Sequence, residues 1–245
     1  MQVSPSDLSK VKHLIKEKIL FGNEPTPELL AILIVYFVQG ILGLSRLAVS
    51  FFLKDELGLN PAEVSALFGI TVLPWVIKPL FGFISDGFPI FGYRRRPYLI
   101  LSGIIGAIAW IVMATVVHSS WTATTAIALS SLSVAMSDVI VDSLVVARAR
   151  AESQAEAGAL QSICWSASAF GGLITAYFSG LLLEYFSTRT IFWLTATFPL
   201  IVSGVAWLIA ETPVEPTKEG EKNNNFEDVK QQIKLLRQAL TRKAI

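Results

Sequence analysis

The chain has 245 residues, of which 53% are hydrophobic and 16% are charged, and its net charge is +1. A soluble domain typically has about 25% charged and 45–50% apolar residues, so this composition excludes an ordinary soluble enzyme and a disordered chain. The single cysteine, Cys164, excludes a disulfide scaffold, and the lack of a large basic patch argues against nucleic-acid binding. The composition therefore predicts an integral membrane protein.

The apolar residues form six blocks, which are separated by Lys, Arg, Asp and Glu. A helix needs about 20 apolar residues to cross a bilayer core of about 30 Å, and each block has about this length. The predicted spans are 29–53, 63–84, 98–117, 121–146, 158–183 and 190–210. We therefore expect an all-α membrane protein with six transmembrane helices.

Lys and Arg are distributed unequally between the two sides of these spans, with 16 on one side and 2 on the other. Because cytoplasmic segments carry the excess of Lys and Arg, both termini are expected in the cytoplasm and the chain in the plasma (inner) membrane. Residues 1–28 form the predicted cytoplasmic N-terminal segment, with a short amphipathic helix at 8–21. Residues 29–210 form the bundle, and residues 211–245 form a cytoplasmic linker and a second amphipathic helix at 226–241.

Four ionisable residues lie within the predicted spans: Arg46, Lys78, Asp138 and Asp142. Each costs about 2.5–3.5 kcal/mol at the centre of a membrane helix, so such residues face a cavity or pair with one another. Asp138 and Asp142 are one turn apart on the same helical face. Two carboxylates this close repel one another unless Arg46 or Lys78 lies beside them, and such a site can bind a proton. The alternative is an ion-paired network that only holds helices together.

Pro74 and Pro79 flank Lys78 in the second span, where they predict a kink in the helix. A kink beside a buried charge is a candidate place for a substrate. Gln39, in the first span, either faces a cavity or cross-links helices. Trp110, in the third span, is expected either in the core or stacked on a substrate.

The connection between the second and third spans contains Gly82, Asp86 and Gly87, followed by Arg94–Arg96. Asp86 can cap a helix or form a salt bridge, while the arginines can reach helix C-termini. A cluster that only fixed orientation would need no Asp-Gly pair at a fixed distance, so we assign this connection a gating role. A similar spacing of Gly180, Glu184 and Arg189 on the opposite side predicts two three-helix units in inverted topology.

The segment GFISDGFPIFGYRRRPY (82–98) resembles the loop 2–3 motif of the major facilitator superfamily. In this form it is similar to that of the folate–biopterin transporter family, which also has acidic residues in its fourth helix, as in Ser137 to Arg150. The segment Phe51 to Ser65 is similar to the first outer loop of that family. The resemblance covers residues from about 30 to 210.

The resemblance implies a major-facilitator-type half bundle and transport of folates, pterins or related organic anions, with proton coupling. It implies that Asp86 and Arg94–Arg96 belong to the gating motif and that Asp138, Asp142 and Arg148 belong to the fourth-helix motif. From the residues themselves we expect Arg46 and Lys78 to bind the glutamate carboxylates of a folate. No cofactor is expected.

Members of that family have twelve or more spans, whereas this sequence has six. The chain is therefore expected to be an N-terminal fragment, a truncated product, or a half that pairs with a second six-helix half or with another copy. A non-transporting membrane subunit is the alternative.

An enzyme is also considered, because Asp138 and Asp142 form the D-x3-D pair of membrane phosphotransferases. In that motif Ala-Arg precedes the pair and Gly lies four residues before its first Asp. Here Ala147–Arg148 follows the pair and Val134 takes the place of the glycine, so no enzymatic activity is expected.

Overall fold

The structure is a computed structural model that describes residue 18 and residues 20–150 and 154–213. The predicted amphipathic helix at 226–241 and nearly all of the one at 8–21 lie outside these residues. In the described part, six helical segments are long and apolar enough to cross a membrane. They are Pro27–Glu56, Pro61–Gly87, Arg96–Thr115, Ser120–Ala149, Glu156–Tyr185 and Thr188–Leu208. The predicted all-α architecture and its six spans are confirmed, with every bound within three residues of the prediction.

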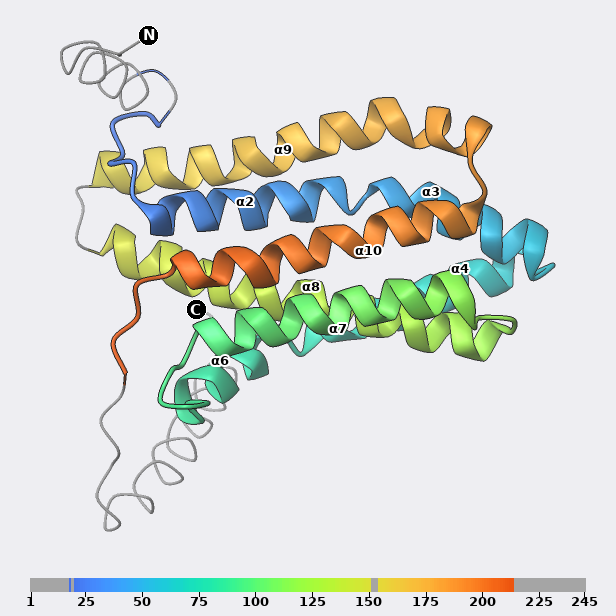
Figure 1. Cartoon of the computed structure of the whole chain (residues 1–245), viewed down its shortest axis with the longest axis horizontal. Coiled ribbons are helices and arrows are strands. Elements are labelled where there is room, and N and C mark those ends of the chain that lie inside the picture. The colour runs from blue at the N-terminus through green and yellow to red at the C-terminus, as the bar shows by residue number, and fades with distance from the viewer. Residues whose placement is uncertain (1–17, 19, 151–153, 214–245) are drawn as a thin grey trace, which may run out of the picture.

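The first two spans are interrupted and the other four are nearly continuous (Figure 1). The first consists of α2 (Pro27–Ile41), α3 (Leu44–Phe51) and the π-helix η1 (Phe52–Glu56), and the second of α4 (Pro61–Thr71), α5 (Leu73–Val76) and α6 (Lys78–Gly87). The remaining spans are α7 (Arg96–Thr115), α8 (Ser120–Ala149), α9 (Gln154–Tyr185) and α10 (Thr188–Val205), which continues into the 3₁₀-helix η2 (Ala206–Leu208).

Polar caps define where these helices begin. Thr26 accepts a hydrogen bond from the backbone of the first turn of α2, and Asn60 forms a capping box with Glu63 at the start of α4. Ser119 and Ser187 cap α8 and α10 in the same way. Such side chains satisfy backbone N–H groups that have no partner within the helix.

The two interruptions have different causes. In the first span, α2 ends before Gly43, and Thr175 of α9 donates to the carbonyls of Gly40 and Ile41 at 3.1 and 3.3 Å. A neighbouring hydroxyl thus satisfies carbonyls near the break, as bilayer burial requires. In the second span, Pro74 and Pro79 lie in the first turns of α5 and α6, which confirms the predicted kink.

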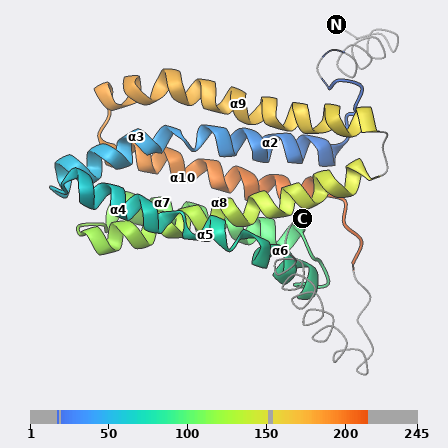
Figure 2. The same ribbon diagram turned by 180° about the vertical axis from the view of Figure 1, so that it is seen from behind.

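The helices pack very unequally. Half or more of the most apolar window is buried in the first span, α7 and α8, whereas only 6% is buried in α9 and 17% in α4–α6. Figures 1 and 2 show α9 at one edge of the bundle beside α2, with α4–α6 on the other side. The core therefore lies among α2, α7, α8 and α10, and the two outer spans expose most of their apolar surface.

Candidate functional site

An ion cluster joins the first, second and fourth spans. Lys78, the first residue of α6, forms ion pairs with Asp138 and with Asp142 of α8, the second at 2.9 Å. Tyr36 of α2 donates from its hydroxyl to the other carboxylate oxygen of Asp142 at 2.6 Å. The break before α6 thus presents Lys78 to two carboxylates that share one face of α8.

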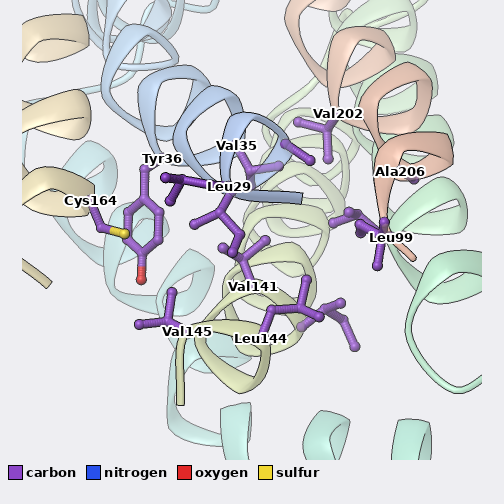
Figure 3. Close-up of a cluster of buried hydrophobic side chains, with 14 of the residues drawn as sticks. Leu29, Val35, Tyr36, Leu99, Val141, Leu144, Val145, Cys164, Val202 and Ala206 are labelled. Carbon is purple, nitrogen blue, oxygen red and sulfur yellow. The ribbon is translucent and has the colours of Figure 1, made fainter. Parts of the chain in front are cut away.

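The cluster contains two acidic groups and one cation. The side chain of Asp138 is 11% exposed, whereas that of Asp142 is 43% exposed. Figure 3 shows Tyr36 beside Cys164 of α9, with its hydroxyl directed toward the part of α8 that carries Val145. Apolar side chains therefore surround one side of the cluster, while Asp142 is open on the other.

Arg46, the fourth predicted charge, does not join this cluster. It lies in α3, beyond the break in the first span, and lines a cavity of about 720 Å³. Within the part of the chain that the structure describes, its guanidinium group has no acidic partner. The cavity walls come from α2 to α5, α7 and α8, and include Phe68, Thr71, Trp75, Trp110, Ser130 and Ser131.

Two residues of the cavity wall also contact the ion cluster. Trp75 lines the cavity, and the centroid of its ring lies 5.7 Å from Lys78 Nζ. Gln39 lines the cavity too, and its buried Nε2 is close enough to Asp138 to interact with it, although it makes no hydrogen bond of normal geometry in the described residues. Gln39 therefore faces a cavity, and Trp110 both lines the cavity and packs against Phe192 in the core.

The predicted gating connection is tied to the end of the sixth span. The backbone N–H groups of Arg94, Arg95 and Arg96 all donate to the carboxylate of Glu211, at 2.7 to 3.2 Å. The guanidinium group of Arg96 donates to the carbonyl of Ile209 and lies over the ring of Trp207. A carboxylate on the first N–H groups of α7 is favourably placed with respect to the helix dipole.

The other residues of this motif are less constrained. Asp86 is exposed, and among the described residues its carboxylate has no hydrogen bond or ion pair. Gly82 lies near Val139 of α8, where an added Cβ would make an ordinary contact. Arg148, at the end of α8, donates to Thr26 Oγ1 at 2.8 Å and to the Glu24 carbonyl at 3.0 Å, and so joins α8 to the start of α2.

At the opposite end of the bundle, Arg189 holds the C-terminus of α7. It donates to the carbonyls of Ala114 and Val117 at 3.2 and 3.0 Å. Its acidic partner is Glu56 of η1, at 3.6 Å. Opposite charges thus bind the two ends of α7, with Glu211 at its N-terminus and Arg189 at its C-terminus, as the helix dipole favours.

Comparison with known proteins identifies the family. The family model described as the BT1 family matches residues 39–245, which is most of the chain. The chain belongs to the BT1 family. It is 56% identical over 235 residues to the folate-biopterin transporter of Synechocystis sp., covering 96% of this chain and 46% of that protein. It is 36% identical to probable folate-biopterin transporter 4 of Arabidopsis thaliana, and the match covers 80% of this chain and 41% of that protein. It is 31% identical to folate transporter 2 of Plasmodium falciparum, and the match covers 78% of this chain and 41% of that protein.

This BT1-family chain spans less than half the length of these relatives. In the described residues, no group of three or more His, Cys, Asp or Glu side chains is arranged to hold a metal ion. The two aspartates of the D-x3-D pair both form ion pairs with the ammonium group of Lys78.

Two members of these sites were not predicted from the sequence of this BT1-family chain. Tyr36 is one of several aromatic residues in an apolar span, and nothing in its local pattern distinguishes it as the partner of Asp142. Glu211 carries a weak signal, because it is the first acidic residue after the sixth span.

Proposed function

We propose that this BT1-family chain forms one helical half of a carrier for folate- or pterin-type organic anions. The observation that carries the proposal is the cavity in which Arg46 has no acidic partner among the described residues and lies near aromatic side chains. The names of the relatives as folate-biopterin transporters agree with such a ligand. The function proposed is transport rather than catalysis.

The chemistry of the cavity suits a flat, anionic heterocycle. Its volume of about 720 Å³ falls within the roughly 300–1,000 Å³ typical of small-molecule sites. A guanidinium group binds a carboxylate through two parallel hydrogen bonds, and Trp75 and Trp110 offer faces for a pteridine ring. Arg46 is therefore assigned to the glutamate carboxylate of a folate.

The ion cluster is proposed as the proton site. Lys78 balances one of its two carboxylates, so that binding of one proton would make the cluster neutral. Charge within the bilayer is costly. A neutral cluster therefore lowers the free-energy cost of the closed state through which the carrier passes during transport. Lys78 thus acts with Asp138 and Asp142 in proton coupling, and anion binding rests on Arg46.

A second six-helix half is the proposed partner. The faces of α9 and α4–α6 expose apolar side chains along most of their length. On α9, Gly158, Gly172 and Gly180 have space for an added Cβ, and small residues of this kind allow close approach of another membrane helix. A second copy of this chain is the other candidate for these faces.

The orientation proposed is cytoplasmic for both termini, with the protein in the plasma (inner) membrane. Arg94–Arg96 and Arg148 then lie on the cytoplasmic side, in accordance with the positive-inside rule. Asp86, which is exposed and unpaired in the described residues, is available there to contact the second half when the carrier closes.

Uptake of labelled folate tests the proposal. Cells that lack their own folate uptake would express this chain alone, or together with the part of the Synechocystis relative that lies beyond the match. We expect uptake only when both parts are present and the lipid-exposed helices have a partner.

Uptake should also collapse in Asp138→Asn and Asp142→Asn proteins that still insert. No uptake with both parts present and inserted would contradict the transport proposal and favour a non-transporting subunit.

A further inference from the structure

Two exposed phenylalanines occupy backbone conformations that phenylalanine rarely adopts. Phe21 has a φ of 49° and is followed by Gly22 at 90°, and Phe91 has a φ of 50° and is followed by Gly92 at 81°. Positive φ at both central residues is the requirement of a type I′ turn, in which the first of them is usually Asn, Asp or Gly. A bulky residue at this position is strained. The chain uses the same unfavourable Phe-Gly pair twice.

The residues on either side hold each turn in this shape. The N–H of Asn23 donates to the carbonyl of Leu20 at 2.9 Å, and Ile90 and Tyr93 exchange two backbone hydrogen bonds of 2.9 Å each. Leu20 is buried in the core, and Ile90 packs against the same cluster of side chains. Strained backbone persists where the surrounding structure fixes it, so these anchors keep both phenylalanines at the tips.

The side chains of both phenylalanines are largely exposed. Phe21 is 54% exposed and Phe91 is 93% exposed. The two turns precede α2 and α7, and both lie at the end of the bundle where these helices begin (Figure 1). An exposed aromatic side chain on a backbone that disfavours it indicates a contact outside the described residues.

Arginines lie beside both turns. Arg94 and Arg95 follow the second turn, and their guanidinium groups form no ion pair within the described residues. Beside the first turn, Arg148 donates to the carbonyl of Glu24 and to Thr26 Oγ1, so its guanidinium group is engaged within the chain. Trp207, which is 68% exposed, lies at the same end, over Arg96, and such aromatic residues mark the level of the headgroups.

We propose that Phe21 and Phe91 insert into the headgroup region of the cytoplasmic leaflet, where Arg94 and Arg95, which follow Phe91, bind the phosphates of anionic lipids. Aromatic rings are enriched at this depth, and arginine binds phosphate in a bidentate manner. The two turns then fix the height of the bundle in the membrane at the start of α2 and α7. This inference rests on the proposed cytoplasmic position of this end of the bundle, and not on which solute is carried.

Thermal unfolding of the whole chain in detergent, with and without added lipid, tests the proposal. Phe21→Asn and Phe91→Asn variants should have a higher melting temperature in lipid-free detergent, by about 2–4 °C, because Asn fits the turn better than Phe. Phosphatidylglycerol should stabilise the wild-type protein more than phosphatidylcholine does, and the Phe91→Asn variant should lose most of that difference. Phe91→Ala should lose it without the gain in detergent, whereas Phe91→Trp should keep it.

Trp121→Ala is the matched control, since Trp121 is 80% exposed at the opposite end of the bundle; it should keep the phosphatidylglycerol effect. A lower melting temperature for the Asn variants in detergent would show that the phenylalanines stabilise the fold, and would overturn the proposal. An unchanged phosphatidylglycerol effect in the Ala variant would overturn it as well. If the Phe variants lose folate uptake in the presence of a second half but keep the phosphatidylglycerol effect, the two turns contact a protein partner and the lipid proposal is overturned.

Discussion

Replacement of Lys78 by methionine is the most informative perturbation of the ion cluster. Methionine retains the length and apolar surface of the lysine stem but removes the cation shared by Asp138 and Asp142. Removing one partner of a buried ion pair costs about 3–5 kcal/mol. Because the side chain of Asp142 is 43% exposed and that of Asp138 only 11%, the loss falls mainly on Asp138, and we expect about 3 kcal/mol.

An independent upper limit comes from protonation. Neutralising one aspartate with an ordinary pKa of about 3.9 at pH 7 costs about 4 kcal/mol, so the Lys78→Met protein loses no more than this if it responds by binding a proton. Asp138→Asn in the same chain should restore about 2 kcal/mol, because it removes the carboxylate that was left without a cation.

The assay is denaturant unfolding in mixed micelles, followed by far-ultraviolet circular dichroism, for the wild-type, both single variants and the double variant. A coupling energy of at least about 2 kcal/mol is expected. Lys54→Met is the control, since Lys54 pairs with Asp55 at 3.8 Å on the surface, and such pairs contribute about 0–1 kcal/mol. Additive costs for Lys78→Met and Asp138→Asn, to within about 0.5 kcal/mol, would refute the shared-cation cluster.

Three further variants test neighbouring parts of the account. Tyr36→Phe removes the hydroxyl donor to the cluster and should lower the free energy of unfolding by about 1.5 kcal/mol; an unchanged value would show that this hydrogen bond does not stabilise the fold. Glu211→Ala should accelerate amide hydrogen exchange at residues 94–96, whose N–H groups lose their acceptor, and undiminished protection would contradict this contact. Gly103→Ala places a Cβ against the carbonyl of Pro199 and should cost about 1–3 kcal/mol. Gly180→Ala meets open space within α9 and should not lower stability, since Ala favours a helix more than Gly does; equal effects would refute the close α7–α10 packing.

Much of the fold follows from the length of the apolar segments and from the prolines that interrupt the helices. The six spans are visible in sequence because apolar residues must continue for about 20 positions to cross the bilayer. The kink in the second span follows from Pro74 and Pro79, since proline cannot continue the backbone ladder. The low burial of α9 compared with the other spans cannot be predicted from the sequence, because a helix that faces lipid and one that faces protein are both apolar.

The candidate site was predicted in part. One-turn spacing puts Asp138 and Asp142 on one face of a helix, and the sequence left open whether Arg46 or Lys78 lies beside them. In the structure Lys78 lies there, and the role of the three residues as a binding site stays a prediction. Arg46 is separate from this cluster because it lies ten residues beyond Tyr36 along the first span, which is about 15 Å in a helix. The interruption at Gly43 contains no proline, so the sequence does not indicate it. The turn at Phe91 was also not predicted, because the sequence signal for a type I′ turn is Asn-Gly or Asp-Gly.

The central claim is that Arg46 recognises the carboxylate of the carried anion. It is tested most directly in a chimera in which this chain replaces the matching segment of the Synechocystis relative, by comparing uptake of labelled folate with that of biopterin, which has no carboxylate. Arg46→Gln should lower the apparent affinity for folate by about tenfold or more, as expected for loss of a hydrogen bond to a charged group, while biopterin uptake and the Lys54→Gln control remain unchanged. Equal losses for folate and biopterin, or no loss for folate, would contradict the assignment of Arg46.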